Sequence, residues 1–313
     1  MKGLELSEKF YNEFGAPMIH SEFPELESII AAGLCGSGSE CFGFDDETSA
    51  DHDFEPGFCI FIPDEDIIDR RTEFLLEKAY NSLPKEFMGY KRENLNPVGG
   101  KRKGVIRIGD FFESKTGSRS GILSTDEWFS IPEHSLAEAV NGKIFRDDLG
   151  MLSEIRNHLS KMPENVRLKK LAGNLLLMGQ SGQYNYLRCL AHGETAAAQL
   201  AAFEFVQSAM RCIFLLNNKY IPFYKWSFRA LKALPVLSHL SADLEYLISS
   251  GNSKTDAKNK AEVIEKVCTF IIAEVKKQGL SDFTGSSAEG HAYSVNNEIK
   301  DCEIRNLNIL YAV

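Results

Sequence analysis

Two aspartates separated by a single residue, Asp51 and Asp53, constrain this chain more than any other feature of its 313 residues. On a β-strand, side chains at positions i and i+2 point to the same face. Two carboxylates on one face repel each other unless a cation or a proton lies between them. Carboxylate oxygens at this spacing suit Mg²⁺, which prefers hard oxygen ligands. The pair therefore predicts a metal site on an extended segment.

A small turn precedes the two acids. It has the sequence Gly36-Ser37-Gly38-Ser39, and eleven residues lie between Ser39 and Asp51. Successive backbone N–H groups in such a turn can hold phosphate oxygens, and the serine hydroxyls add further donors. Together, the turn and the acid pair predict a site that binds a nucleoside triphosphate with its metal.

Composition limits the classes of partner. The net charge of −9 and the isoelectric point of about 5.4 argue against a general nucleic-acid coat, although they leave room for a local basic groove. The seven cysteines are scattered without a CxxC pair, which favours reduced thiols over a disulfide framework or a zinc site. No run reaches the roughly 18 apolar residues of a membrane span, and the first residues lack an apolar signal core. We expect a soluble, cytoplasmic protein with no membrane partner.

The first half of the chain mixes helical and strand patterns. We expect two short amphipathic helices over residues 4–14 and 24–32, separated by a break at 15–17. Compact apolar runs predict strands at 57–62 and 104–112, and helical periodicity predicts a helix over 64–83. A Gly/Pro/Lys-rich stretch at 95–103 reads as a loop.

From about residue 150 the pattern changes, because Pro and Gly become sparser and long periodic segments dominate. We expect an N-terminal α/β part followed by a helical part, with domains at 1–145 and 146–313. The helices are expected at residues 151–161, 164–178, 184–217, 222–234 and 257–278.

The string GSGSECFGFDDETSADHDF, residues 36–54, resembles a bacterial nucleotidyltransferase-like family of unknown function in the polymerase-beta-type nucleotidyltransferase superfamily. The superfamily pattern is an apolar residue, Gly, then Gly or Ser, a spacer, and two acids flanking one residue. Both Gly38-Ser39 and Gly36-Ser37 fit it, so the register of the turn stays open. His52 departs from the pattern, because the residue between the acids is usually apolar. The similarity continues through blocks at 128–132, 142–147, 156, 214–217 and 220–226.

This resemblance implies an α+β fold, in which a nucleotidyltransferase-type mixed sheet flanked by helices precedes an α-helical C-terminal domain. It also implies two-metal chemistry, with Asp51 and Asp53 holding two Mg²⁺ ions that bridge the triphosphate and the attacking oxygen. Gly36, Ser37, Gly38, Ser39 and their N–H groups would hold phosphates, and Ser49 would support that turn.

The superfamily site usually includes a third carboxylate on a later strand, which binds the catalytic metal and in some members accepts the acceptor's proton. Asp110, at the end of the run GVIRIGDFF, is our candidate. Asp147 is the reserve, although an acid at such a position more often caps the helix that follows. A solvent-exposed acid at a strand end is the structural alternative for Asp110.

A polyphosphate also needs cations, and the resemblance points to the helical half of the chain. The candidates are Arg156, Arg188, Lys219 and Lys225. Lys225 is the most attractive, because Tyr224 and Trp226 flank it and could stack on a base or an acceptor. Taken singly, each basic residue is more often a solvated surface charge.

These features predict an enzyme that transfers an NMP group from an NTP, ATP being the favoured nucleotide, to a hydroxyl or amine with release of pyrophosphate. A small-molecule acceptor fits the acidic surface best; a protein or an RNA 3′ end is the alternative acceptor. The second hypothesis is a catalytically inactive nucleotide-binding regulatory module. The third reads His52-Asp53 as the centre of an HD-type phosphohydrolase, which the Gly-rich turn and the following β-type run argue against.

Overall fold

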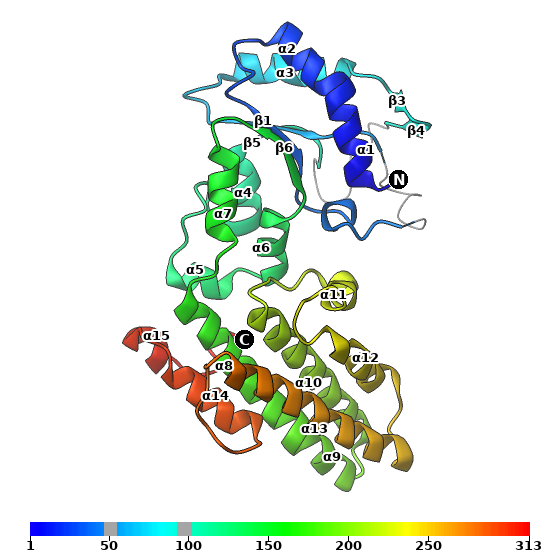
Figure 1. The fold of residues 1–313 in the computed structure, drawn as a ribbon, viewed down its shortest axis with the longest axis vertical. Coiled ribbons are helices and arrows are strands. Elements are labelled where there is room, and N and C mark those ends of the chain that lie inside the picture. Colours follow the sequence, from blue (N-terminus) through cyan, green and yellow to red (C-terminus); the bar gives the residue numbers. More distant parts are fainter. Residues whose placement is uncertain (47–54, 93–101) are drawn as a thin grey trace. The chain divides into compact units, whose positions relative to one another are not determined.

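The computed structural model describes residues 1–46, 55–92 and 102–313 of the chain. These residues form two compact units (Figure 1). The first comprises residues 1–123 and 134–161, and the second comprises residues 124–133 and 162–313. The first contains a mixed sheet with helices and the second is helical, so the expected α+β class is confirmed.

The sheet of the first unit has four strands in the order β5-β2-β1-β6. Its central strands, β1 (Ala31–Leu34) and β2 (Cys59–Ile62), are buried along their whole length and run antiparallel to each other. Strand β5 (Gly104–Arg107) pairs parallel with β2, while β6 (Lys143–Asp147) pairs antiparallel with β1. The strand predicted at 57–62 is confirmed as β2, which needs no polar alternation because it is buried on both faces, whereas β1 was not predicted as a strand.

The N-terminal helical segment differs from expectation. Helix α1 (Gly3–Phe10), the π-helical turn η1 (Tyr11–Gly15) and α2 (Ala16–Glu22) follow one another without a break. Gly15 does not end the helix; a Cβ there would lie 2.3 Å from Cζ of Phe58, so glycine allows close packing on β2. Pro17 lies in the first turn of α2, directly after the π-helical turn.

The helix predicted over residues 24–32 is wrong. Residues 24–29 form turns, and residues 31 and 32 already belong to β1. The apolar residues at its end, 30–32, are consecutive and all buried, as in a strand at the centre of a sheet, and do not form one face of a helix. Short apolar runs of this kind do not distinguish strand from helix by periodicity alone.

One face of the sheet packs on α1, α2 and α3 (Arg70–Ser82). Helix α3 begins at the N-cap Asp69, whose carboxylate accepts from the backbone N–H of Thr72, so the predicted helix at 64–83 starts later than expected. A short hairpin, β3 (Glu86–Phe87) and β4 (Tyr90–Lys91), follows α3. The core on this face includes Leu6, Phe10, Phe58, Ile60, Ile62 and Leu76.

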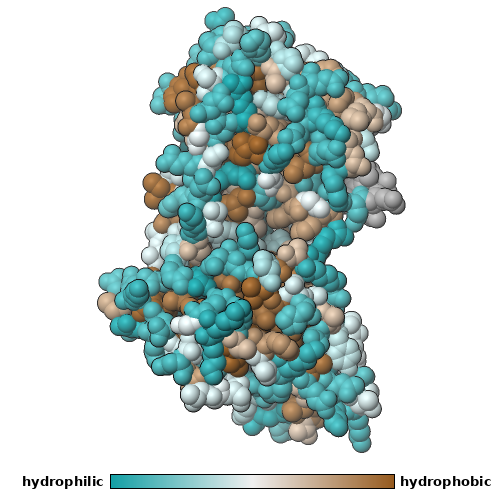
Figure 2. Space-filling view, in the orientation of Figure 1, coloured by the Kyte–Doolittle hydropathy of each residue, from teal (hydrophilic) through white to brown (hydrophobic). Residues whose placement is uncertain are grey.

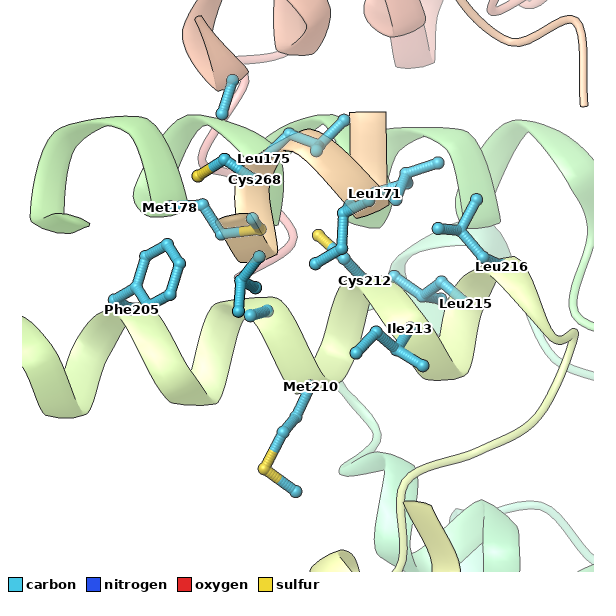
Figure 3. Close-up of a cluster of buried hydrophobic side chains, with 14 of the residues drawn as sticks. Leu171, Leu175, Met178, Phe205, Met210, Cys212, Ile213, Leu215, Leu216 and Cys268 are labelled. Carbon is cyan, nitrogen blue, oxygen red and sulfur yellow. The ribbon is translucent and has the colours of Figure 1, made fainter. Parts of the chain in front are cut away.

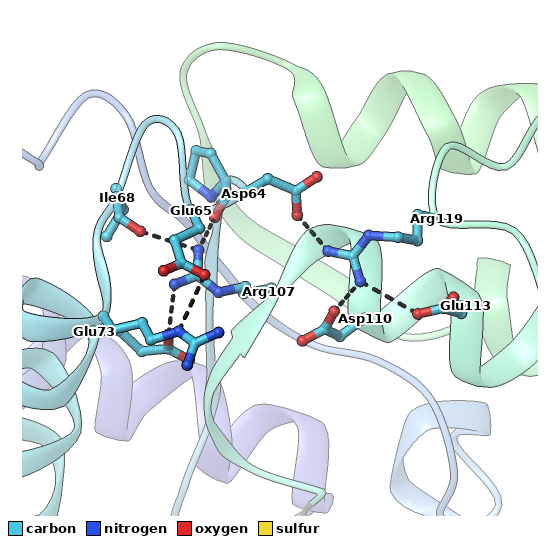
Figure 4. A network of polar contacts seen from close by, with 10 residues as sticks. Asp64, Glu65, Ile68, Glu73, Arg107, Asp110, Glu113 and Arg119 are labelled. Atoms are coloured by element: carbon cyan, nitrogen blue, oxygen red, sulfur yellow. Dashed lines mark hydrogen bonds and ion pairs between the residues drawn. The ribbon is translucent and has the colours of Figure 1, made fainter.

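The strand predicted at 104–112 is half right. It stops at Arg107, and α4 (Ile108–Thr116) begins directly after it. The buried Arg107 guanidinium donates to the carbonyls of Pro63 and Ile68 and forms an ion pair with Glu73, which ties the end of β5 to the segment after β2 (Figure 4).

The domain boundary predicted at 145/146 lies inside β6, whose residues 146 and 147 pair with β1. Helix α7 (Met151–Leu159) packs on β6 and belongs to the same unit, so the chain passes finally into the helical unit after residue 161. Most of α6 (Glu133–Val140) also belongs to the first unit.

The second unit is built around α8 (Glu164–Met178) and α10 (Thr195–Leu216), whose facing side chains form an apolar core (Figure 3). The helix predicted at 164–178 is confirmed at both ends. The one predicted at 184–217 is interrupted before α10, where Gly193 has a positive φ of 77°. The other described elements of this unit are α5 (Thr125–Ser130), η4 (Gly179–Tyr186), α9 (Leu187–Ala191), α11 (Tyr224–Leu231), η5 (Ser238–Leu240), α12 (Ser241–Ser249), α13 (Lys254–Lys277), α14 (Ala288–Asn297) and α15 (Cys302–Asn306).

Helix α10 is long and apolar enough to span a membrane, contrary to the expectation that no segment would be. In its most apolar window, 61% of the residues are buried inside the protein, as in the core helix of a soluble fold. The face of the molecule in Figure 2 is mostly hydrophilic, and its hydrophobic residues lie in separate groups.

Candidate functional site

The Gly/Ser turn, residues 36–39, follows directly on the buried strand β1. Gly36 and Gly38 have φ values of 102° and 130°. Side-chain-bearing residues rarely adopt such angles, so glycine is required at both positions for the chain to fold back on itself. The turn thus lies just after the carboxyl end of a central strand.

Asn141 holds the first residue of the turn. The N–H of Gly36 donates to Oδ1 of Asn141 over 2.8 Å, and Nδ2 of Asn141 donates back to the carbonyl of Gly36 over 2.8 Å. Gly142 follows, and a Cβ there would lie 2.0 Å from the carbonyl oxygen of Leu34. The connection between α6 and β6 therefore packs against the end of β1 and fixes where the turn begins.

Ser37 belongs to a polar triad with Lys115 on α4 and Glu138 on α6. Its hydroxyl donates to Oε2 of Glu138 over 2.7 Å. The ammonium of Lys115 lies 2.9 Å from Oγ of Ser37 and 2.5 Å from the same Oε2. A side-chain hydroxyl, an ammonium and a carboxylate thus meet at the turn.

The middle of the turn is tight. A Cβ at Gly38 would lie 2.5 Å from Oε2 of the buried Glu40, so that carboxylate lies close to the turn backbone. The carbonyl of Ser39 accepts from the N–H groups of Phe42 and Phe44. Within the described part of the chain, the N–H groups of residues 37–39 donate to no acceptor. Free N–H groups in a turn of this kind are suited to an anion.

Arg156 supports the turn from α7. Its Nη1 donates to Sγ of Cys35 over 2.6 Å, and its Nη2 donates to the carbonyl of Val140 over 3.0 Å. Burial raises the pKa of the Cys35 thiol, and the neighbouring guanidinium opposes that rise. Arg156 was predicted from the helical half, yet it belongs to the unit that contains the sheet.

Asp110 does not lie at a strand end. It occupies the first turn of α4 and is paired with the guanidinium of Arg119, which also bonds Asp64 over 2.5 Å (Figure 4). The side chains of α4 nearest the turn are instead Phe111 and Lys115, which would lie 3.3 Å and 3.9 Å from a Cβ at Gly36. The strand-end placement was wrong because β5 stops at Arg107.

Asp147, the reserve acid, has a helix-capping contact. Its Oδ2 accepts from the backbone N–H of Ser153 over 2.7 Å, in the first turn of α7. A carboxylate at a helix N-terminus is stabilised by the unpaired N–H groups there. This capping contact explains why an acid lies at position 147, and it requires no bound metal.

The other three predicted cations lie in the helical unit. Arg188 donates to the hydroxyl of Tyr184 over 2.9 Å and lies above its ring. Lys225 is exposed, with its ammonium 4.4 Å from the ring centroid of Trp226. Lys219 is exposed in the connection after α10. Each is a surface charge here.

Asp51 and Asp53, the predicted metal pair, and Ser49 lie outside the described residues. Within residues 1–46, 55–92 and 102–313, no group of three His, Cys, Asp or Glu side chains could hold a metal ion.

Three residues at the turn were not predicted from the sequence, because no spacing rule links them to it: Lys115, Glu138 and Asn141. One signal was present: Gly142 begins a block that carries the family resemblance. Its neighbour Asn141 turns out to hold Gly36.

The sequence model of one family, described as a domain of unknown function (DUF4037), matches residues 128–227. This is less than half of the chain, and it includes Glu138, Asn141 and Arg156 but not the Gly/Ser turn. No curated protein and no solved structure matches the chain. The similarity carries no named activity.

Proposed function

We propose that this protein is a Mg²⁺-dependent nucleotidyltransferase. It would transfer an NMP group from an NTP, with ATP the favoured nucleotide, to a hydroxyl or amine of a small-molecule acceptor, and release pyrophosphate. We also propose that its mixed sheet corresponds to a nucleotidyltransferase-type arrangement, in which the turn after β1 holds phosphates.

The observation that supports this function is the Gly/Ser turn itself. It lies at the end of a buried central strand, its two glycines have positive φ angles, and its N–H groups at residues 37–39 are free within the described chain. Such a turn can bind phosphate oxygens through backbone donors. Lys115 adds a cation beside it.

The proposed metal ligands are inferred from the sequence, in which Asp51 and Asp53 are separated by one residue. Asp51 and Asp53 would bind the two Mg²⁺ ions, which would stabilise the charge that builds on the α-phosphate and on departing pyrophosphate.

The test is pyrophosphate release from each of the four NTPs with Mg²⁺, using cell lysate as the acceptor pool. Asp51→Asn and Asp53→Asn should each abolish release while thermal unfolding is unchanged. Asp66→Asn, which alters an exposed acid, is the matched control and should keep wild-type activity. Release at the wild-type rate by both Asp51→Asn and Asp53→Asn would exclude the proposed chemistry.

One observation favours the second candidate, a nucleotide-binding module without catalysis. Asp110 on α4, the candidate third carboxylate, is paired with Arg119, and the α4 side chains next to Gly36 are those of Phe111 and Lys115. NTP binding with no pyrophosphate release from any NTP would support this module over the enzyme.

A further inference from the structure

In the triad of Ser37, Lys115 and Glu138, a hydroxyl and an ammonium form an anion site, and the Glu138 carboxylate is the anion that they bind. A single carboxylate oxygen, Oε2 of Glu138, receives hydrogen bonds from the Ser37 hydroxyl and the Lys115 ammonium. A phosphate oxygen has the same needs: it accepts from hydroxyls and ammonium groups and is stabilised by positive charge.

The triad adjoins the part of the turn that an anion would contact. Ser37 is the first of the three residues with free backbone N–H groups, and Lys115 reaches it from α4. The side chains of Lys115 and Glu138 are 17% and 16% exposed, so solvent reaches the pair. Glu138 is therefore a carboxylate at the rim of the turn rather than a group sealed in the core.

We propose that Glu138 is an internal anion that holds Ser37 and Lys115 when the turn is empty, and that a triphosphate replaces it there. Lys115 is then a phosphate-binding residue, and Glu138 is a competitor for the same donors. This inference rests on the proposed function, since it names the residues that receive the triphosphate of that site.

Electrostatics give the exchange a direction. With Glu138 ionised, the Lys115 ammonium is already neutralised, so an incoming polyphosphate meets a carboxylate as well as a cation. The negative charges of the Glu138 carboxylate and of the polyphosphate repel each other, and the repulsion is stronger in a partly buried site than in open solvent. A neutral side chain of the same shape at position 138 would leave Lys115 available, and it would remove the repulsion.

The two members of the pair should therefore act in opposite directions. Lys115→Met should weaken binding of inorganic triphosphate and of ATP by about 10-fold or more, because a charge-assisted contact is lost. Glu138→Gln should tighten both by about 3- to 10-fold, because the competing charge is removed while the shape is kept. Ser37→Ala should weaken both to a smaller extent.

Isothermal titration calorimetry at low ionic strength measures the binding, and thermal unfolding of each variant confirms that it folds. The matched control is the surface ion pair of Lys143 and Glu8, whose charged atoms lie 2.7 Å apart in the same unit. Lys143→Met and Glu8→Gln should bind as the wild type does.

A purely structural ion pair would give a different pattern. Weaker or unchanged binding in Glu138→Gln, wild-type binding in Lys115→Met, or no triphosphate binding by the wild type each overturn the inference. Opposite shifts without pyrophosphate release from any NTP would support the inference and reject the transferase. Release that neither variant alters would support the transferase and reject the inference.

Discussion

The guanidinium of Arg156 donates to the thiol sulfur of Cys35 across 2.6 Å, and Cys35 directly precedes the Gly/Ser turn. Its second nitrogen donates to the carbonyl of Val140, the last residue of α6. One side chain on α7 therefore links the end of β1 to the end of the helix that carries Glu138. An arginine predicted to contact a nucleotide has a positioning role in the described structure.

Arg156→Met should lower the free energy of unfolding by about 1–3 kcal/mol, because it removes two hydrogen bonds and leaves the Val140 carbonyl without this donor. Urea denaturation measures the change. Arg188→Met, at the exposed arginine on α9, is the control and should stay within about 0.5 kcal/mol of wild type. Equal stability of the two variants would contradict the positioning role.

Alanine substitutions at Gly142 and Gly150 separate the cost of close packing from the cost of backbone strain, because the two glycines have the same φ angle. Both have a φ of 71°, but a Cβ at Gly142 would lie 2.0 Å from the carbonyl of Leu34, whereas a Cβ at Gly150 would meet no atom within 4 Å. Gly150→Ala should cost about 1–2 kcal/mol from strain alone. Gly142→Ala should cost clearly more, because the strand pairing of β1 and β6 must also shift.

Soluble yield and urea denaturation compare the two alanine variants. Similar losses would mean that the connection before β6 moves away without cost, and that Asn141 does not fix the turn as described.

Local patterns predicted much of the fold. Apolar periodicity located α8 at both ends, and a compact apolar run located β2, whereas β1 was not predicted as a strand. Predictions failed where tertiary contacts decide. At the end of β5, Arg107 bonds carbonyls of a distant segment, and Gly15 lies inside the N-terminal helical segment at a point where Phe58 packs closely against it. Neither contact leaves a trace in nearby sequence.

The candidate site was predictable only in part. The Gly/Ser composition of residues 36–39 predicted the turn, because positive φ angles require glycine. The groups that surround it come from α4, α6 and α7, far along the chain. The sequence could not single out Lys115 among the 35 lysines and arginines, because only its contacts with Ser37 and Glu138 in the folded chain distinguish it.

His291 should make the helical unit less stable in acid. It is fully buried on α14; its Nδ1 lies 2.7 Å from the hydroxyl of Ser281 and its Nε2 lies 3.0 Å from the carbonyl of Gly285. A neutral ring with the proton on Nε2 satisfies both partners. Burial lowers the pKa of His291, and nearby Lys276 acts in the same direction, while the Gly285 carbonyl opposes them.

Because the folded pKa of His291 lies below the unfolded value of about 6.5, the unfolded chain takes up the proton first as pH falls. The stabilisation is complete above about pH 6.5 and is lost as pH falls through the folded pKa. His291→Asn should flatten the dependence of unfolding free energy on pH between 7 and 5. His192→Asn, at an exposed histidine, should keep the wild-type slope.

Lys169 holds the C-terminal segment on α8. Its side chain is fully buried, and its ammonium donates to Oδ1 of Asn296 and to the carbonyls of Arg305 and Leu307 at 2.8, 3.1 and 2.7 Å. Lys169→Met should lower the free energy of unfolding by about 2–4 kcal/mol, since Oδ1 of Asn296 and the carbonyl of Leu307 lose this donor, while the carbonyl of Arg305 keeps its bond from Nδ2 of Asn296. Lys258→Met changes an exposed lysine 3.9 Å from Glu262 and should cost under about 0.5 kcal/mol. Amide hydrogen exchange should also quicken in α15 for Lys169→Met alone. Exchange that quickens evenly over the whole unit, or a cost equal to that of Lys258→Met, would mean that the three acceptors are satisfied without this ammonium.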